Sequence, residues 1–304
     1  MKRLLLATIT VLMLGGVAWA GQYEDGFEAQ GRGDYTTALR IFGELAGQGH
    51  ASAQHNLGFL YEKGVGIKQD LPEALKWYRL AAAQGVRNAQ NNLGAMFEKG
   101  LGVKKDISEA LKWYRLAAAQ GQATAQFNLA VFYATGQGVK QDNAEAVNWY
   151  HLSAGQGEAN AQNNLGVMYR DGQGVKTDDV SAVKWLQLAA AQGLATAQLN
   201  LGGMYDAGKG VRQDYSEAFK WFRLAAIQGD AVAQANLGSM YHDGQGVAQD
   251  YVRSLMWLSL SAISGNATAA KSRDIVAAKT TRQQLTQAQQ MAHGCQQRNF
   301  KGCD

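Results

Sequence analysis

A tryptophan recurs every 36 residues through most of this chain, and a glutamine 23 residues before each tryptophan keeps the same spacing. The six copies are Gln54/Trp77, Gln90/Trp113, Gln126/Trp149, Gln162/Trp185, Gln198/Trp221 and Gln234/Trp257. A fixed period of this size is typical of repeat proteins, in which each unit is one small motif that stacks on its neighbours. The sequence therefore predicts one array of six units over residues 50–265, although a length of 304 residues alone would suggest two globular domains.

Each unit carries two helical patterns. In the first unit Ala53, Leu57 and Leu60 lie on one face of a helix. Gly64 ends that helix, because glycine accepts the left-handed conformation. An aspartate then begins a second helix as its N-cap, and a glutamate three residues later predicts a capping box in four of the six units. These pairs are Asp70/Glu73, Asp106/Glu109, Asp142/Glu145 and Asp214/Glu217.

Helices this short are marginal in isolation, and each pair buries its apolar faces only against the pairs beside it. The predicted fold is therefore all-α: a right-handed superhelical α-solenoid of stacked antiparallel helix pairs with a 36-residue repeat. Residues 21–49 are predicted to form an atypical N-terminal helical pair. Residues 266–304 are predicted to form a C-terminal helical cap that includes a polar, glutamine-rich helix.

The repeated pattern resembles a known family. The first unit reads Ala53-Gln54-x-Asn56-Leu57-Gly58-x-x-Tyr61-x-x-Gly64-x-Gly66, then Asp70-x-x-Glu73-Ala74-x-x-Trp77-x-x-x-Ala81-Ala82-x-x-Gly85. This pattern is similar to the Sel-one-like repeat of the tetratricopeptide superfamily, and it covers about three quarters of residues 21–304. Departures are small, such as Ala130 in place of the first-helix glycine. The resemblance implies an adaptor that binds a protein or peptide partner on the concave face formed by the first helix of each pair.

Another branch of the family suggests a different function. Some cysteine-rich relatives are described as penicillin-binding or β-lactamase-like, and they carry a disulfide in each repeat. Residues 49–265 contain no cysteine, so the similarity to that branch is weak. A cell-wall-associated enzyme or receptor, related to peptidoglycan or β-lactams, is the alternative to a scaffold.

Residues 1–20 have the three parts of a secretory signal peptide: the basic Lys2 and Arg3, the apolar stretch 4–14 and a small-residue motif that ends at Ala20. We expect cleavage after Ala20 and export to the periplasm of a Gram-negative bacterium, or secretion beyond it. The apolar stretch is too short to cross roughly 30 Å of hydrocarbon, and no later segment reaches the ~20 apolar residues required. No transmembrane segment is expected.

The two cysteines, Cys295 and Cys303, lie near the C-terminus. In an oxidising compartment a disulfide between them would close a short loop and stabilise it by roughly 2 to 3 kcal/mol. A metal site would need more ligands than this segment offers, since only His293 is near, and a redox pair is more often spaced C-x-x-C. The spacing therefore favours a disulfide.

Charge and motif content argue against other functional classes. Twenty-nine Lys and Arg against 25 Asp and Glu give a mild, interspersed net charge of +4, which is no electrostatic footprint for nucleic acid. The five histidines form no HExxH pattern, and no GxSxG nucleophile motif occurs. We therefore expect a non-enzymatic protein without a metal ion or cofactor.

One asparagine per unit forms a ladder on the first helices and is the candidate partner-binding feature. The six are Asn56, Asn92, Asn128, Asn164, Asn200 and Asn236. An amide both donates and accepts hydrogen bonds, so this ladder is suited to hold the backbone of an extended peptide whatever its sequence. Alternatively, each asparagine bonds the backbone of the neighbouring unit and only holds the stack together.

Positions that vary among the units would then discriminate between partners. On the same helices the candidates are His55, Phe127, Arg170, Asp206 and His242. Variation at a fixed geometry is what a recognition surface requires, but drift on a solvated face produces it too. The sequence thus predicts an exported, non-enzymatic scaffold whose partner it does not identify. A third hypothesis is that the C-terminal helix and the cysteine loop dock onto a larger complex.

Overall fold

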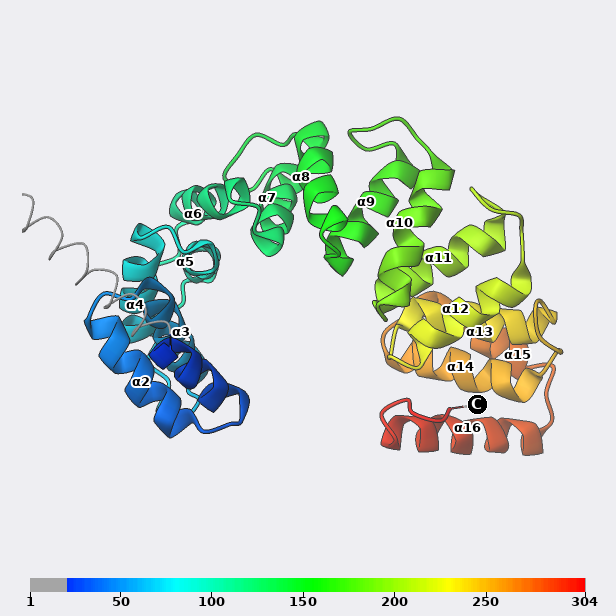
Figure 1. Ribbon diagram of the computed structural model, residues 1–304. Helices are drawn as coiled ribbons and strands as arrows, with labels where there is room; N and C mark the ends of the chain where they lie inside the picture. Colours follow the sequence, from blue (N-terminus) through cyan, green and yellow to red (C-terminus); the bar gives the residue numbers. More distant parts are fainter. Residues whose placement is uncertain (1–20, 304) are drawn as a thin grey trace, which may run out of the picture. The chain divides into compact units, whose positions relative to one another are not determined.

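The computed structural model describes residues 21–303, and every regular element in this range is a helix (Figure 1). The predicted leader, residues 1–20, lies outside the described residues. A first helical segment ends at residue 31, and none of the helices described is long and apolar enough to span a membrane. The helices that follow are α2 (Tyr35–Gly47), α3 (Ala51–Lys63), α4 (Leu71–Ala83), α5 (Arg87–Lys99), α6 (Ile107–Ala119), α7 (Ala123–Thr135), α8 (Asn143–Gly155), α9 (Ala159–Asp171), α10 (Asp179–Ala191), α11 (Ala195–Ala207), α12 (Tyr215–Ala226), α13 (Ala231–Asp243), α14 (Tyr251–Ile263), α15 (Ala267–Ala277) and α16 (Arg282–Gln297).

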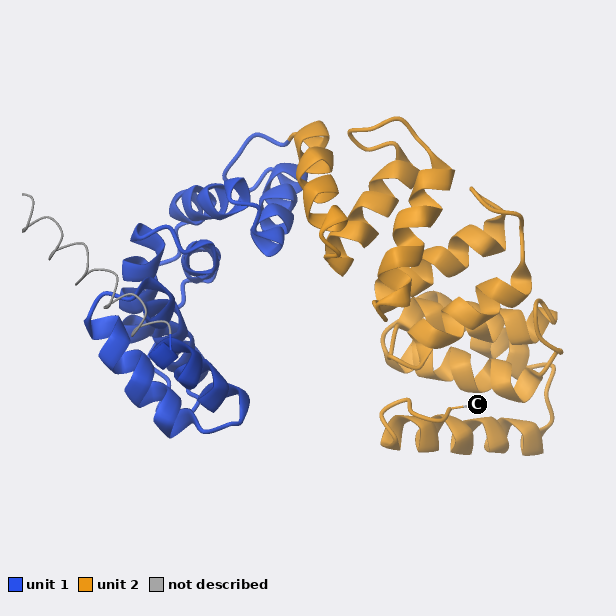
Figure 2. Cartoon of the chain, viewed as in Figure 1, with its two compact units in different colours: residues 1–141 blue, residues 142–304 orange. Residues whose placement is uncertain are grey.

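The chain divides into two compact units, residues 1–141 and 142–304 (Figure 2). In the first unit consecutive helices from α2 to α7 pack against one another, and in the second unit the same holds from α8 to α15. First and second helices alternate, and each type recurs about every 36 residues. The predicted all-α solenoid of stacked helix pairs is therefore confirmed within each unit. The boundary between the units falls inside the third repeat, between α7 and α8.

The aspartates that precede the second helices act as N-caps, as predicted. In every repeat the carboxylate accepts a hydrogen bond from a backbone N–H two or three residues later. The reciprocal half of the predicted capping box is wrong, because the glutamates bond other side chains. Glu73 pairs with the ammonium group of Lys76 at 2.8 Å. Glu145 has no such lysine, since residue 148 is asparagine, and it accepts the indole N–H of Trp149 at 2.8 Å.

Glycines in the first helices let the two helices of a repeat approach closely. A Cβ added to Gly94 would lie 2.8 Å from the Tyr114 ring, and one added to Gly202 would lie 2.7 Å from the Phe222 ring. Real Cβ atoms do not come this close to a neighbour, because protein interiors are already close-packed. The glycine and the large side chain opposite it therefore set the distance between the helices of a repeat.

The loop between the two helices of a repeat also requires glycine. In the second repeat Gly102 has a φ of 67° and lies against Leu71, the first residue of the preceding second helix. A Cβ at Gly102 would come within 2.7 Å of the Leu71 carbonyl carbon. The equivalent glycine also lies against the first residue of the preceding second helix at Gly138/Ile107 in the first unit, through the isoleucine side chain, and in the second unit at Gly174/Asn143, Gly210/Asp179 and Gly246/Tyr215, through the backbone. These loops therefore fix the spacing between repeats within each unit.

The C-terminal helix α16 packs against α14, the second helix of the sixth repeat. It covers Trp257 and Leu260, which share a core with Ala292 of α16 and are each 1% exposed. The leucine in the register of Leu260 is 37 to 53% exposed in the other five repeats. Helix α16 therefore shields a surface that the other second helices present to solvent.

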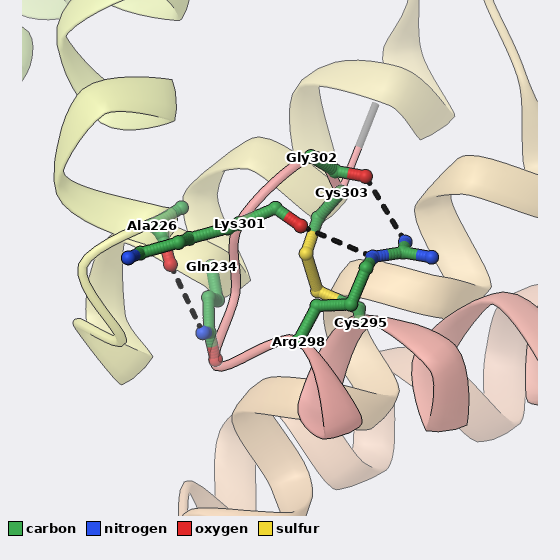
Figure 3. Close-up of a disulfide and its surroundings, with 7 residues drawn as sticks. All are labelled: Ala226, Gln234, Cys295, Arg298, Lys301, Gly302 and Cys303. Atoms are coloured by element: carbon green, nitrogen blue, oxygen red, sulfur yellow. Dashed lines mark hydrogen bonds between the residues drawn. A yellow bond between two sulfur atoms is a disulfide. The ribbon is translucent and has the colours of Figure 1, made fainter.

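A disulfide joins Cys295 of α16 to Cys303, and both cysteines are buried in this core (Figure 3). Arg298 donates to the carbonyl oxygens of Lys301 and Gly302 at 3.1 and 3.0 Å. The disulfide and the arginine together hold the last residues of the chain against the second unit.

Gly202 and Gly203 are adjacent in α11 and provide a matched test of helix packing. We expect Gly202→Ala to lower the free energy of unfolding by about 1 to 3 kcal/mol, because the new Cβ overlaps the Phe222 ring. Gly203→Ala meets nothing within 4 Å. It should raise the free energy of unfolding by about 0.5 to 1 kcal/mol, since alanine favours the helix. Urea unfolding followed by circular dichroism measures both, and equal effects would contradict the contact.

The disulfide gives a second prediction. Replacing Cys295 and Cys303 together by alanine should lower the stability of the C-terminal cap by roughly 2 to 3 kcal/mol, because the loop closure is lost. Hydrogen exchange should then speed up in α16 and in α14 beneath it. Amides of α9 serve as the internal control, and unchanged exchange in α16 would contradict the stabilising role.

Candidate functional site

The first helices of the repeats form one face within each unit. They are α3, α5 and α7 in the first unit, and α9, α11 and α13 in the second, where α15 continues the series. This surface is termed the first-helix face of the unit. Two sets of amide side chains, one glutamine and one asparagine per repeat, lie on these helices.

The recurring glutamine connects each repeat to the preceding one. Gln90 is buried, and its Nε2 donates to the carbonyl oxygen of Ala82, in the last turn of the preceding second helix, at 3.2 Å. Its Oε1 accepts a hydrogen bond from Nε2 of Gln120, after the second helix of the same repeat, at 2.7 Å. The bond to the preceding repeat recurs in the pairs Gln54/Ala46, Gln126/Ala118, Gln162/Ala154, Gln198/Ala190 and Gln234/Ala226. The buried amide is thereby satisfied from two sides.

The sequence marked this glutamine as part of the repeat but did not reveal its role. The missed signal is a second glutamine 30 residues later, present at Gln84, Gln120, Gln156, Gln192 and Gln228. In the sixth repeat this position is Ser264. Oε1 of Gln234 is buried there, and no hydrogen-bond partner for it occurs among residues 21–303. The exception shows that the two glutamines act as a pair.

In the first unit the asparagine ladder belongs to a chain of side-chain hydrogen bonds. Nδ2 of Asn56 donates to Oη of Tyr23 at 3.0 Å, and Oδ1 of Asn56 lies 3.1 Å from Nδ1 of His55. Nδ2 of Asn92 lies 3.4 Å from Nε2 of His55. Burial lowers the pKa of His55, which favours the neutral imidazole. A neutral ring that carries its proton on Nδ1 donates to Asn56 and accepts from Asn92.

This chain of side-chain hydrogen bonds continues into the third repeat. Nδ2 of Asn91 donates to Oδ1 of Asn92 at 3.4 Å, and Nδ2 of Asn128 donates to Oδ1 of Asn91 at 3.3 Å. The ladder amides therefore reach a side chain of the preceding repeat rather than its backbone.

The second unit repeats this arrangement. Nδ2 of Asn164 donates to Oη of Tyr150 at 3.0 Å, and Nδ2 of Asn163 donates to Oδ1 of Asn164 at 3.2 Å. Nδ2 of Asn200 donates to Oδ1 of Asn163 at 3.0 Å, and Arg170 Nη1 donates to Oδ1 of Asn200 at 3.1 Å. In Asn92 and Asn200 both the nitrogen and the oxygen of the amide therefore have partners within the array. Peptide binding by the ladder stays a prediction.

A cavity of about 470 Å³ opens between α5 and α7 in the first unit. It is lined by Asn91, Ala95, Glu98 and Lys99 of α5, Tyr114 of α6, and Thr124, Phe127, Asn128, Val131 and Phe132 of α7. Tyr114 Oη donates to Glu98 Oε2 at 2.7 Å. Burial raises the pKa of the Tyr114 phenol, and the hydrogen bond to Glu98 and its negative charge add to this rise. The phenol thus stays protonated and holds the carboxylate in place.

Two further cavities lie on the first-helix face of the second unit. One, of about 350 Å³, is lined by Arg170, Leu199, Asn200, Gly203, Met204, Ala207, Lys209, Phe222, Val232 and Asn236. The other, of about 190 Å³, is lined by Ser239, His242, Asp243, Leu258, Ser272, Ile275 and Val276. Arg170 carries a salt bridge to Asp171 at 2.7 Å, and the resulting hydrogen bond raises the arginine pKa.

The structure brings some of the sequence-predicted residues to these cavities and leaves others elsewhere. The residues that line them are Phe127, Asn128, Arg170, Asn200, Asn236 and His242. Those that line none of the three are His55, Asn56, Asn92, Asn164 and Asp206. Sequence reasoning missed Tyr114 and Phe222 as lining residues, because they come from second helices. Their signal is the position after the repeated tryptophan, which is large in every unit.

Comparison with known families matches the array. The family model for the Sel1 repeat matches residues 51–86, 87–122, 123–158, 159–194, 195–230 and 231–266. These are the six units found from the tryptophan period, shifted by one residue. No curated protein matches the chain.

Two solved structures resemble the chain in sequence and in fold. A Sel1 repeat protein from Oxalobacter formigenes is 36% identical with a TM-score of 0.72, and the match covers 80% of this chain and 99% of that protein. A protective antigen present in uropathogenic Escherichia coli strains, which displays an SLR fold, is 31% identical with a TM-score of 0.67. That match covers 94% of this chain and 70% of the antigen.

The glutamine pairing can be tested with two substitutions. Gln198→Leu should lower the free energy of unfolding by about 1 to 3 kcal/mol, because it removes two hydrogen bonds, one to the Ala190 carbonyl and one from Nε2 of Gln228. Gln234→Leu should lower it less, since Oε1 of Gln234 has no partner within the described chain. Chemical denaturation of the two variants measures the difference. A larger loss for Gln234→Leu would contradict the pairing.

Proposed function

Because the chain belongs to the Sel1 repeat family, whose repeats generally mediate protein–protein interactions, we propose that it is an exported, non-enzymatic scaffold that binds a protein partner through its first-helix faces. Sel1 repeat proteins are typically non-enzymatic scaffolds. The partner contributes an extended segment that lies across consecutive first helices.

One observation carries this proposal: the three cavities on the first-helix faces are lined by positions that differ among the repeats. Phe127, Arg170 and His242 each line a different cavity. The glutamine that recurs in every repeat bonds a backbone carbonyl of the preceding helix and keeps the framework constant. A constant framework with variable walls is suited to recognition of one particular partner.

Two features support export. Residues 1–20 have the composition of a secretory leader, although they lie outside the described residues. The buried disulfide between Cys295 and Cys303 suits an oxidising compartment such as the bacterial periplasm.

Site-directed photocrosslinking in the cell envelope tests the proposal. A benzophenone amino acid replaces Phe127 of α7 or Leu199 of α11, both of which line cavities. Matched control positions are Leu116 of α6 and Leu188 of α10, exposed by 44 and 50% on second helices. We expect a discrete protein adduct from the cavity positions and none from the controls. Equal capture at all four positions, or no capture at the cavity positions, would refute the first-helix faces as the binding surface. Capture of peptidoglycan fragments alone would support a cell-wall receptor instead.

A further inference from the structure

We propose that the cavity between α5 and α7, termed the α5–α7 cavity, receives a basic side chain, lysine or arginine, of the protein partner. This inference rests on the proposed scaffold function and adds the chemistry of one contact. Its basis is a positioned carboxylate beside aromatic rings, a combination that suits an ammonium or guanidinium group.

The carboxylate of Glu98 has one oxygen to spare. In the preceding repeat both oxygens of Glu62 are engaged, since Oε1 bonds Lys63 at 2.6 Å and Oε2 accepts from Tyr78 at 2.7 Å. Oε2 of Glu98 accepts from Tyr114 in the same way. Oε1 of Glu98, however, has no partner among the residues that the structure describes. A cation that enters the cavity would therefore find a fixed and unpaired acceptor.

The only cation in the lining does not neutralise this acceptor. Lys99 is exposed at the end of α5, and it forms no salt bridge with Glu98 in the described chain. The equivalent Lys63 does pair with Glu62. The charge of Glu98 is thus open to an external partner, whereas that of Glu62 is already compensated within the protein.

Aromatic and polar groups complete the cavity wall. The rings of Tyr114 and Phe132 lie 5.9 Å apart at 46°, and Phe127 lines the cavity beside them. Such rings attract a cation through their faces and pack against the alkyl stem of lysine or arginine. Nδ2 of Asn128 is bonded to Asn91, so Asn128 offers its carbonyl oxygen as an acceptor.

This combination is specific to one cavity. The position of Phe127 carries no aromatic ring other than His55 in the remaining five repeats. The 350 Å³ cavity of the second unit has no carboxylate in its lining and instead contains Arg170 and Lys209. That cavity provides an internal comparison of opposite charge.

The test uses small probes and the whole protein. N-acetyl-arginine methylamide and N-acetyl-lysine methylamide are titrated while the methyl resonances of Ala95 and Val131, which line the cavity, are followed by NMR. We expect saturable shifts with both probes. Glu98→Gln, which keeps an oxygen for the Tyr114 hydrogen bond, should weaken the binding of the probes about five-fold. Glu62→Gln is the matched control and should change the binding of the probes little.

Two probes of different chemistry serve as negative controls. The methylamides of N-acetyl-glutamate and N-acetyl-norleucine should leave the Ala95 and Val131 resonances unshifted. The inference would be overturned if either control probe caused equal shifts. It would also be overturned if the basic probes bound the Glu98→Gln variant as tightly as the original protein.

The inference and the scaffold function fail in different ways. A crosslinked partner whose capture at Phe127 is unaffected by Glu98→Gln would leave the scaffold standing and remove the basic-side-chain contact. Glu98-dependent binding of the basic probes without any crosslinked protein would support the chemistry of the cavity and refute the scaffold. Phe127→Leu is a second variant. It should weaken the binding of the basic probes, because it removes the aromatic ring and keeps an apolar wall.

Discussion

The hydrogen bond from the first-helix glutamine to the preceding repeat is the constraint on which the rest of the structure depends. Most helices here have 13 residues, a length at which an isolated helix is marginal, so the chain folds only if each repeat attaches to its neighbours. The buried amide of Gln90 attaches at two points, to the Ala82 carbonyl and to Gln120. The loop glycine then fixes the spacing, as Gly102 does against Leu71. Within each unit these contacts place successive first helices in one register, and that register creates the cavities.

The sequence predicted whatever depends on periodicity. The helix pairs, the aspartate N-caps and the glycine ends follow from a 36-residue pattern that any unit repeats. The prediction from sequence failed where two local partners compete for one group. Glu73 bonds Lys76 instead of closing a capping box. Glu145 bonds Trp149, because no lysine competes there. Nor did the periodicity reveal the boundary between the two units, which lies inside the third repeat, the one in which Ala130 replaces the first-helix glycine.

In the candidate site, too, the sequence revealed the residues that recur but not their partners. The asparagines were found because they recur, but their partners were not, since the contact from Asn92 to His55 spans 37 residues and Tyr23 lies outside the repeats. A one-residue offset from the period arises because adjacent first helices meet side by side, and only the fold shows which side chains then face each other. Glu98 illustrates this limit. Its sequence position resembles that of Glu62, and only their different partners separate a compensated charge from an open one.

The sixth repeat shows what happens when the repeated rule is broken. Ser264 replaces the paired glutamine, which leaves Oε1 of Gln234 buried without a described partner. A solenoid must also stop exposing a stacking surface at its end, and terminal units accordingly depart from the consensus. Helix α15 keeps the first-helix register, but α16 packs on α14, where Met256 replaces the exposed lysine of four other repeats and is 1% exposed. The apolar surface of α14 is therefore matched to α16. The disulfide between Cys295 of α16 and Cys303 holds α16 on the sixth repeat, the repeat that lacks the second glutamine of the pair.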